Sequence, residues 1–245
     1  MATSTGSLEF YNFDSATTRL GKRSSKQVTE ASTLVLDLLW HPSRADVIAV
    51  TLSDGAVALC RSSVNYKSDA RPWGASSTAT TTELATHSLE PWTLAFSPDA
   101  ELLFSGGDDA VLQALKLRPI DTDTNARSED DEDATAATLL WTDRKSHEAG
   151  VTSILPLAND LLITGSYDDR IRLLSAPAVG RRKVLAELDL GGGVWRLKML
   201  GSGHGQRYVT SFFFPCVSVH PFFFSPCSSW TNAVRRVRQS RAGVR

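Results

Sequence analysis

Three stretches of this chain share one order of local structure, and this repetition constrains the fold more than any other feature. Each reads as a strand, a turn, a second strand, a tight acidic turn and a third strand, because short β-branched and Leu-rich runs alternate with Gly, Asp and Pro. The stretches cover residues 34–60, 90–117 and 149–175. Repetition of one short antiparallel unit predicts an all-β repeat architecture.

The spacing of the units indicates which repeat architecture this is. The spacing between equivalent residues of successive units is somewhat wider than the ~40–45 residues of a common propeller blade. The extra length falls in residues 61–86, which are rich in Ser, Thr and Ala, and in residues 119–138, which contain the acidic run SEDDEDA. Long loops between blades account for the difference, so the pattern favours a β-propeller. We expect residues 119–138 to form a disordered acidic loop between two blades.

A His and an Asp recur at equal separation in two of the units. His87 precedes Asp108 by as many residues as His147 precedes Asp168. The units resemble WD repeats, in which a His before the first strand and an Asp between the second and third strands form a hydrogen-bonded pair. The ending ITGSYDDRIRLL of the third unit is similar to the GSxDxxIRLWD ending of that family. The resemblance therefore implies that these four residues are structural blade pairs.

Partial units flank the three complete ones. Residues 6–13 resemble the last strand of an earlier blade, and residues 191–199 resemble the first strand of a following blade. The expected fold class is thus all-β, an incomplete WD40-type β-propeller with about three to four blades, and we assign it residues 6–200.

Several longer strings resemble a particular WD-repeat family, the diphthine methyltransferases. They are HSLEPWTLAF (87–96), FSGGDDAVLQAL (104–115), HEAGVTSI (147–154), TGSYDDRIRLL (164–174) and LGGGVWRLK (190–198). Despite its name, the family is one of methylesterases of diphthamide biosynthesis. The resemblance implies hydrolysis of the methyl ester of diphthine on the modified histidine of translation elongation factor 2, which would be the protein substrate and partner. The alternative is a non-catalytic WD-repeat scaffold for protein–protein interaction.

Ester hydrolysis requires an activated nucleophile and a group that stabilises the oxyanion. The chain has no GxSxG, no HExxH and no Gly-rich phosphate loop, so a His or a carboxylate acting on water is the simpler option. Glu90 is a weak catalytic candidate or a solvated carboxylate. Trp195 and Arg196 follow three glycines and are suited to holding a peptide and an anion, although Trp195 is equally suited to packing between blades. The catalytic base stays open.

The first strands of the blades line a propeller's central channel, and residues near their ends reach the face that binds ligands. Alignment of the units places four residues at equivalent positions there: Asp37, Thr93, Thr152 and Trp195.

Composition excludes several classes of function. The net charge of −1 gives no reason to expect nucleic-acid or membrane binding. Cys60, Cys216 and Cys227 form neither a paired framework nor a CxxC motif, so we expect a reducing compartment, no metal and no cofactor. The N-terminus shows no signal peptide and no apolar run is long enough to span a bilayer, which makes a cytoplasmic location the default expectation.

The C-terminal segment, residues 201–245, departs from the rest of the sequence. It carries two Phe triplets among Pro, Ser and Cys, followed by an Arg-rich end. Pyrimidine-rich codons encode Phe, Pro, Ser and Cys, so we hypothesise an aberrant, disordered tail, translated from an intron from about Val209, in a C-terminally truncated or mis-spliced chain. The alternative is a genuine disordered or membrane-touching tail.

Overall fold

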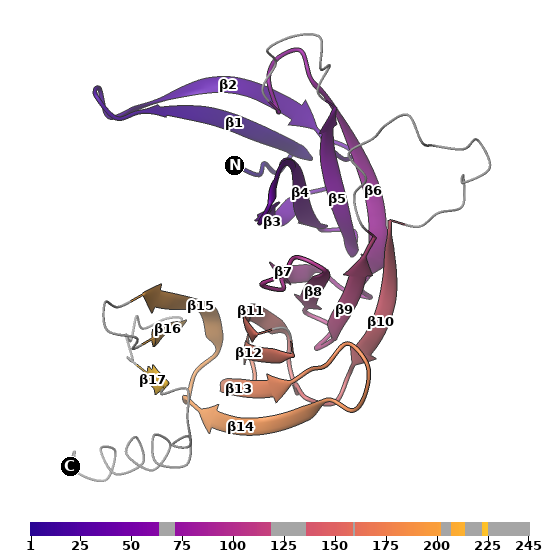
Figure 1. Cartoon of the computed structure of the whole chain (residues 1–245), viewed down its shortest axis with the longest axis vertical. Coiled ribbons are helices and arrows are strands. Elements are labelled where there is room, and N and C mark those ends of the chain that lie inside the picture. The colour runs from indigo at the N-terminus through magenta and orange to yellow at the C-terminus, as the bar shows by residue number, and fades with distance from the viewer. Residues whose placement is uncertain (64–71, 119–135, 159, 202–206, 214–221, 225–245) are drawn as a thin grey trace.

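The computed structural model describes residues 1–63, 72–118, 136–158, 160–201, 207–213 and 222–224. These residues form antiparallel β-sheets that follow one another round an arc, with the first strand of each sheet nearest the centre (Figure 1). The three complete repeat units become three four-stranded sheets. The all-β propeller class predicted from the repeats is therefore confirmed.

Each complete sheet contains four consecutive strands in chain order. The first comprises β3 (Val35–His41), β4 (Arg44–Leu52), β5 (Ala56–Ser63) and β6 (Thr78–Thr86). The second comprises β7 (Pro91–Phe96), β8 (Leu102–Gly107), β9 (Leu112–Leu117) and β10 (Ala137–Asp143). The third comprises β11 (Val151–Ala158), β12 (Leu161–Ser166), β13 (Arg170–Ser175) and β14 (Lys183–Asp189).

Partial sheets stand on either side of the complete ones. The hairpin of β1 (Ser7–Asp14) and β2 (Arg19–Gln27) precedes the first sheet. It packs there through Leu8 and Val28, and its register corresponds to the third and fourth strands of a blade. Residues 6–13 therefore form the third strand of a blade, and not the last strand as the sequence predicted. The third sheet is followed by β15 (Val194–Gly201), β16 (Arg207–Phe213) and β17 (Phe222–Phe224).

Two predicted segments are only partly covered by the described residues. Of the predicted acidic loop, residues 119–135 lie outside them, and residues 137–138 already belong to β10. Of the predicted disordered tail, two segments form strands β16 and β17, and most of the remainder lies outside the described residues. The intron hypothesis and the domain boundaries stay predictions.

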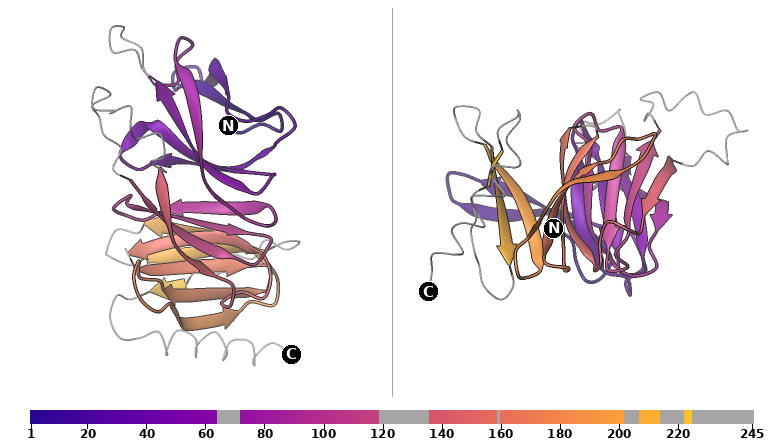
Figure 2. Two further views of the ribbon diagram at one scale, coloured as in Figure 1. Left: turned by 90° about the vertical axis from the view of Figure 1, so that its right-hand side faces the viewer. Right: turned by 90° about the horizontal axis from the view of Figure 1, so that it is seen from below.

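Apolar side chains fill the spaces between successive sheets. One layer joins Phe104, Leu112 and Trp141 of the second sheet to Val151 and Leu162 of the third. Equivalent layers lie between the first and second sheets, and between the third sheet and β15. Figure 2 shows the sheets stacked side by side, as such layers require. Since each complete sheet is covered on both faces, its middle strands are mostly apolar.

None of the described residues forms a helix long and apolar enough to cross a membrane.

Candidate functional site at the channel mouth

A β-bulge interrupts each of the four innermost strands at the same place, just after its first residue. The ladder register shifts between Val35 and Asp37, between Pro91 and Thr93, between Val151 and Ser153, and between Val194 and Arg196. The bulged residues are Leu36, Trp92, Thr152 and Trp195. A bulge changes the direction of a side chain and is frequent beside active sites.

The four bulged residues meet around one small cavity. It has a volume of about 130 Å³ and is lined by Leu36, Asp37, Trp92, Thr152, Trp195 and Arg196. Two of the catalytic candidates from the sequence, the neighbouring residues Trp195 and Arg196 on β15, thus both line the cavity. Glu90 is not among the lining residues, and its backbone carbonyl accepts a hydrogen bond from the Asp108 amide.

The ladder register corrects the sequence alignment of the inner strands. The ladder places Asp37 and Thr93 at the position held by Ser153 and Arg196, and not at the position of Thr152 and Trp195. Because all four strands bulge at the same place, the offset of one residue lies in the sequence alignment, which short apolar strands do not fix.

Asp37 is the carboxylate of the cavity. Its Oδ1 accepts a hydrogen bond from the Leu38 amide at 2.9 Å, and its Oδ2 accepts one from the Leu94 amide of the next sheet at 3.3 Å. Burial raises the pKa of Asp37 above its ordinary value, although the two amide hydrogen bonds and the positive charge of Arg196 act in the opposite direction. The sequence predicts Asp37 near a strand end but indicates no chemistry for it; only the cavity shows its proximity to Arg196.

The predicted blade pair of the second unit has a different acidic partner. His87 Nδ1 donates to Oδ1 of Asp109 at 3.0 Å, and its Nε2 lies 2.9 Å from Ser105 Oγ. Asp109 also accepts the Ser88 amide at 3.0 Å, whereas Asp108 is exposed. The structural role predicted for His87 therefore stands, but Asp108 was the wrong partner.

An unequal hairpin explains this error. Thr93 pairs with Gly106, whereas its equivalent Ser153 pairs with Gly165, so the hairpin is one residue longer in the second sheet. Equal spacing from the His therefore selects Asp108 in one unit and Asp168 in the other. The true equivalent of Asp168 is Asp109.

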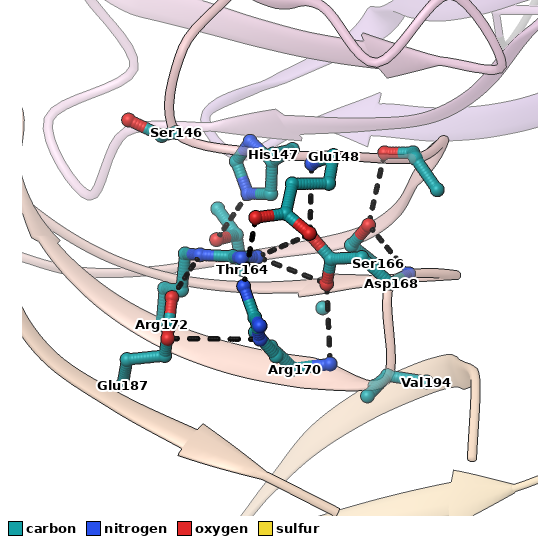
Figure 3. A network of polar contacts seen from close by, with 12 residues as sticks. Ser146, His147, Glu148, Thr164, Ser166, Asp168, Arg170, Arg172, Glu187 and Val194 are labelled. Atoms are coloured by element: carbon teal, nitrogen blue, oxygen red, sulfur yellow. Dashed lines mark hydrogen bonds and ion pairs between the residues drawn. The ribbon is translucent and has the colours of Figure 1, made fainter. Parts of the chain in front are cut away.

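The predicted pair of the third unit is replaced by a wider network (Figure 3). His147 Nε2 bonds Thr164 Oγ1 at 2.8 Å, and its Nδ1 is buried without a partner among the described residues. Asp168 instead pairs with the buried guanidinium of Arg172 at 2.8 Å, and Arg172 also contacts Glu187 at 2.8 Å. The direct hydrogen bond between His147 and Asp168 was thus a wrong prediction, since Arg172 satisfies the carboxylate.

Burial lowers the pKa of His147 to about 4, with a further contribution from the charge of Arg172. A neutral, enclosed imidazole fits a structural role better than proton transfer to a ligand. Among the described residues, no group of three or more His, Cys, Asp or Glu side chains is placed to hold a metal ion.

The blades and the cavity at their centre define the class of this protein as a WD-repeat β-propeller. The family described as WD domain, G-beta repeat matches residues 78–113 and 138–175. Each match begins on the outermost strand of one sheet and ends in the third strand of the next. In solved structures, a chain of the Mitotic Checkpoint Complex shares the fold, with a TM-score of 0.58, 23% identity, and coverage of 91% of this chain and 58% of that one.

Among WD-repeat proteins, the chain is similar to curated diphthine methyltransferases. A diphthine methyltransferase homolog of Dictyostelium discoideum is 29% identical over 201 residues, 80% of this chain and 49% of its own length. Diphthine methyltransferase of Schizosaccharomyces pombe is 30% identical over 212 residues, 85% of this chain and 55% of its own length. The chain is similar to these diphthine methyltransferases over most of its own length, and it spans about half the length of the two relatives.

Proposed function

We propose that this chain acts in diphthamide biosynthesis as a methylesterase, which hydrolyses the methyl ester of diphthine on translation elongation factor 2. The observation that carries the proposal is the presence of a partly buried carboxylate, Asp37, and a guanidinium, Arg196, on the lining of one cavity at the channel mouth. The names of the curated relatives support the substrate.

The chemistry assigned to the cavity needs a base and a cation. Asp37 would take a proton from water as the oxygen attacks the ester carbonyl, and its raised pKa makes it a stronger base than an exposed Asp. Arg196 would stabilise the negative oxygen of the tetrahedral intermediate. Collapse of the intermediate, with return of the proton from Asp37 to the leaving methoxide, yields methanol and the carboxylic acid, which loses its remaining proton to solvent.

Methanol release tests the proposal. The 245-residue chain is incubated with elongation factor 2 that carries methylated diphthine, and methanol and the mass of the factor are followed. We expect stoichiometric methanol and a mass loss of one methylene group; the demethylated factor serves as a control and releases none.

The competing function is a non-catalytic WD-repeat scaffold in the same pathway. It predicts stable binding of elongation factor 2 without methanol, and that result would overturn the esterase proposal. We also propose a cytoplasmic location, since the substrate is a translation factor and the cysteine pattern fits a reducing compartment.

A further inference from the structure

Three aromatic side chains from three different sheets form a row beside the cavity. The rings of Trp92 and Trp195 lie 6.3 Å apart at 50°, and the rings of Trp195 and Tyr167 lie 5.6 Å apart at 49°. Tilted rings do not cover one another's faces as stacked rings do. Trp195 is 44% exposed and Tyr167 is 40% exposed, so aromatic surface is open to solvent at this end of the channel.

Two glycines create the space for this row. A methyl group at Gly193 would lie 3.0 Å from Tyr167 Cδ1, and a methyl group at Gly150 would lie 3.3 Å from Tyr167 Cδ2. Side chains at these positions would displace the Tyr167 ring. The glycines of the GGGVW string thus do more than form a tight connection: Gly193 allows the ring of Tyr167 to approach Trp195.

Carboxylates lie at both ends of the row. Asp37 lines the cavity with Trp92 and Trp195. A methyl group placed on Gly150 would lie 2.9 Å from Asp108 Oδ1 and 3.3 Å from Tyr167 Cδ2, so Asp108 and the Tyr167 ring lie beside the same glycine. The charge of Asp108 contributes to a raised pKa of the Tyr167 hydroxyl, after the larger effect of burial. Asp108 is exposed and is not used in the blade pair, which Asp109 forms instead. Arg196 is the positively charged residue of the cavity lining. Its proposed role is to stabilise the negative oxygen that forms from the ester carbonyl.

We propose that the row of Trp92, Trp195 and Tyr167, flanked by Asp37 and Asp108, is a binding site for a methylated ammonium group. Aromatic faces attract such cations through their quadrupole, and the methyl groups add apolar contact that an ammonium ion lacks. The adjoining cavity of about 130 Å³ admits a head group but not a drug-sized ligand, which needs 300 Å³ or more.

Two probes of equal shape, one charged and one neutral, separate the contribution of the positive charge to binding from that of the methyl groups. Choline carries the cation, and 3,3-dimethylbutan-1-ol is its neutral isostere. Binding to the full chain is followed by tryptophan fluorescence and by the shifts of the indole N–H signals in NMR spectra. We expect saturable binding of choline and at least about fivefold weaker binding of the neutral alcohol.

Variants locate the site. Trp195→Ala and Asp108→Asn should each weaken choline binding by about threefold or more, whereas Trp195→Phe should retain part of it. Trp40→Ala is the matched control, because Trp40 is 45% exposed but lies on β3 against Phe10 and Trp73. Circular dichroism establishes that each variant is folded.

Equal binding of the two probes, or binding unaffected by Trp195→Ala, would overturn the inference. The outcome is independent of methanol release. A chain that binds choline at Trp195 but releases no methanol supports the cation site and contradicts the esterase, and the reverse result contradicts the cation site alone.

Discussion

His87 Nδ1 lies 3.0 Å from Oδ1 of Asp109, and this contact fixes the loop before β7 to the turn between β8 and β9. Burial alone would raise the pKa of Asp109, but the hydrogen bonds from His87 and from the Ser88 and Val111 amides lower it overall. The carboxylate is therefore charged and satisfied inside the blade.

Loss of that charge should destabilise the blade. Asp109→Asn is expected to lower the free energy of unfolding by about 1–3 kcal/mol, because a buried charge-assisted hydrogen bond is weakened. Asp108→Asn, one residue away and exposed, should change it by less than about 0.5 kcal/mol. Urea unfolding followed by tryptophan fluorescence measures both. A larger effect at Asp108 would contradict the observed pairing.

The imidazole of His147 should make stability depend on pH. Its pKa is about 4 in the folded chain, against an ordinary value of 6.5. Between these values the unfolded chain binds a proton that the folded chain does not, so the stabilisation is complete above pH 6.5 and is lost as pH falls towards 4. The loss reaches on the order of 3 kcal/mol.

NMR titration of His147 and urea unfolding at pH 7 and pH 4.5 test this expectation. His147→Gln should remove the His147 part of the difference between the two pH values. If the variant keeps the full pH dependence of the parent chain, another group is responsible.

The close contact between β12 and β15 should not tolerate a side chain at Gly165. A methyl group there would overlap Val194 Cγ1 and lie 3.0 Å from Val194 Cβ. Gly165→Ala is expected to cost about 1–3 kcal/mol through overpacking. Gly21→Ala is the control, since an added methyl group meets nothing within 4 Å. Thermal unfolding compares the two, and equal melting temperatures would show that β15 yields without cost.

Removal of the proposed base should abolish turnover. Asp37→Asn is expected to slow methanol release by ~10²–10⁴-fold, the usual contribution of a general base. The rate of the parent chain should also fall as pH drops below the raised pKa of Asp37, because the protonated carboxyl cannot accept a proton. Asp46→Asn, at a partly exposed carboxylate paired with Arg44, is the control and should keep the parent rate. Normal turnover by Asp37→Asn would exclude this base.

The repeat pattern predicted much of the fold, because each blade is a local unit. Strand order, hairpins and the apolar layers follow from short runs whose partners are close in sequence. The GGDD and SYDD turns are also visible in the sequence, since Ala110 and Asp169 take positive φ at equivalent places after an acidic residue.

The site was less predictable, since it depends on offsets of a single residue. The longer hairpin in the second sheet makes Asp109 and not Asp108 the partner of His87, and the ladder register places Asp37 and Thr93 one position away from Thr152 and Trp195. The secondary-structure propensities of the residues indicate neither the hairpin length nor the ladder register. Trp195 and Arg196 were named because the GGGVWRLK string was unusual, whereas Asp37 had no unusual context.

The sequence by itself therefore determined a WD-repeat propeller, because spacing and composition encode contacts made within a blade. Only the tertiary structure decided which side chains meet at the channel mouth. Asp37, Trp92, Thr152 and Trp195 come from four different sheets, and their meeting depends on how the sheets pack around the axis and on where each innermost strand bulges.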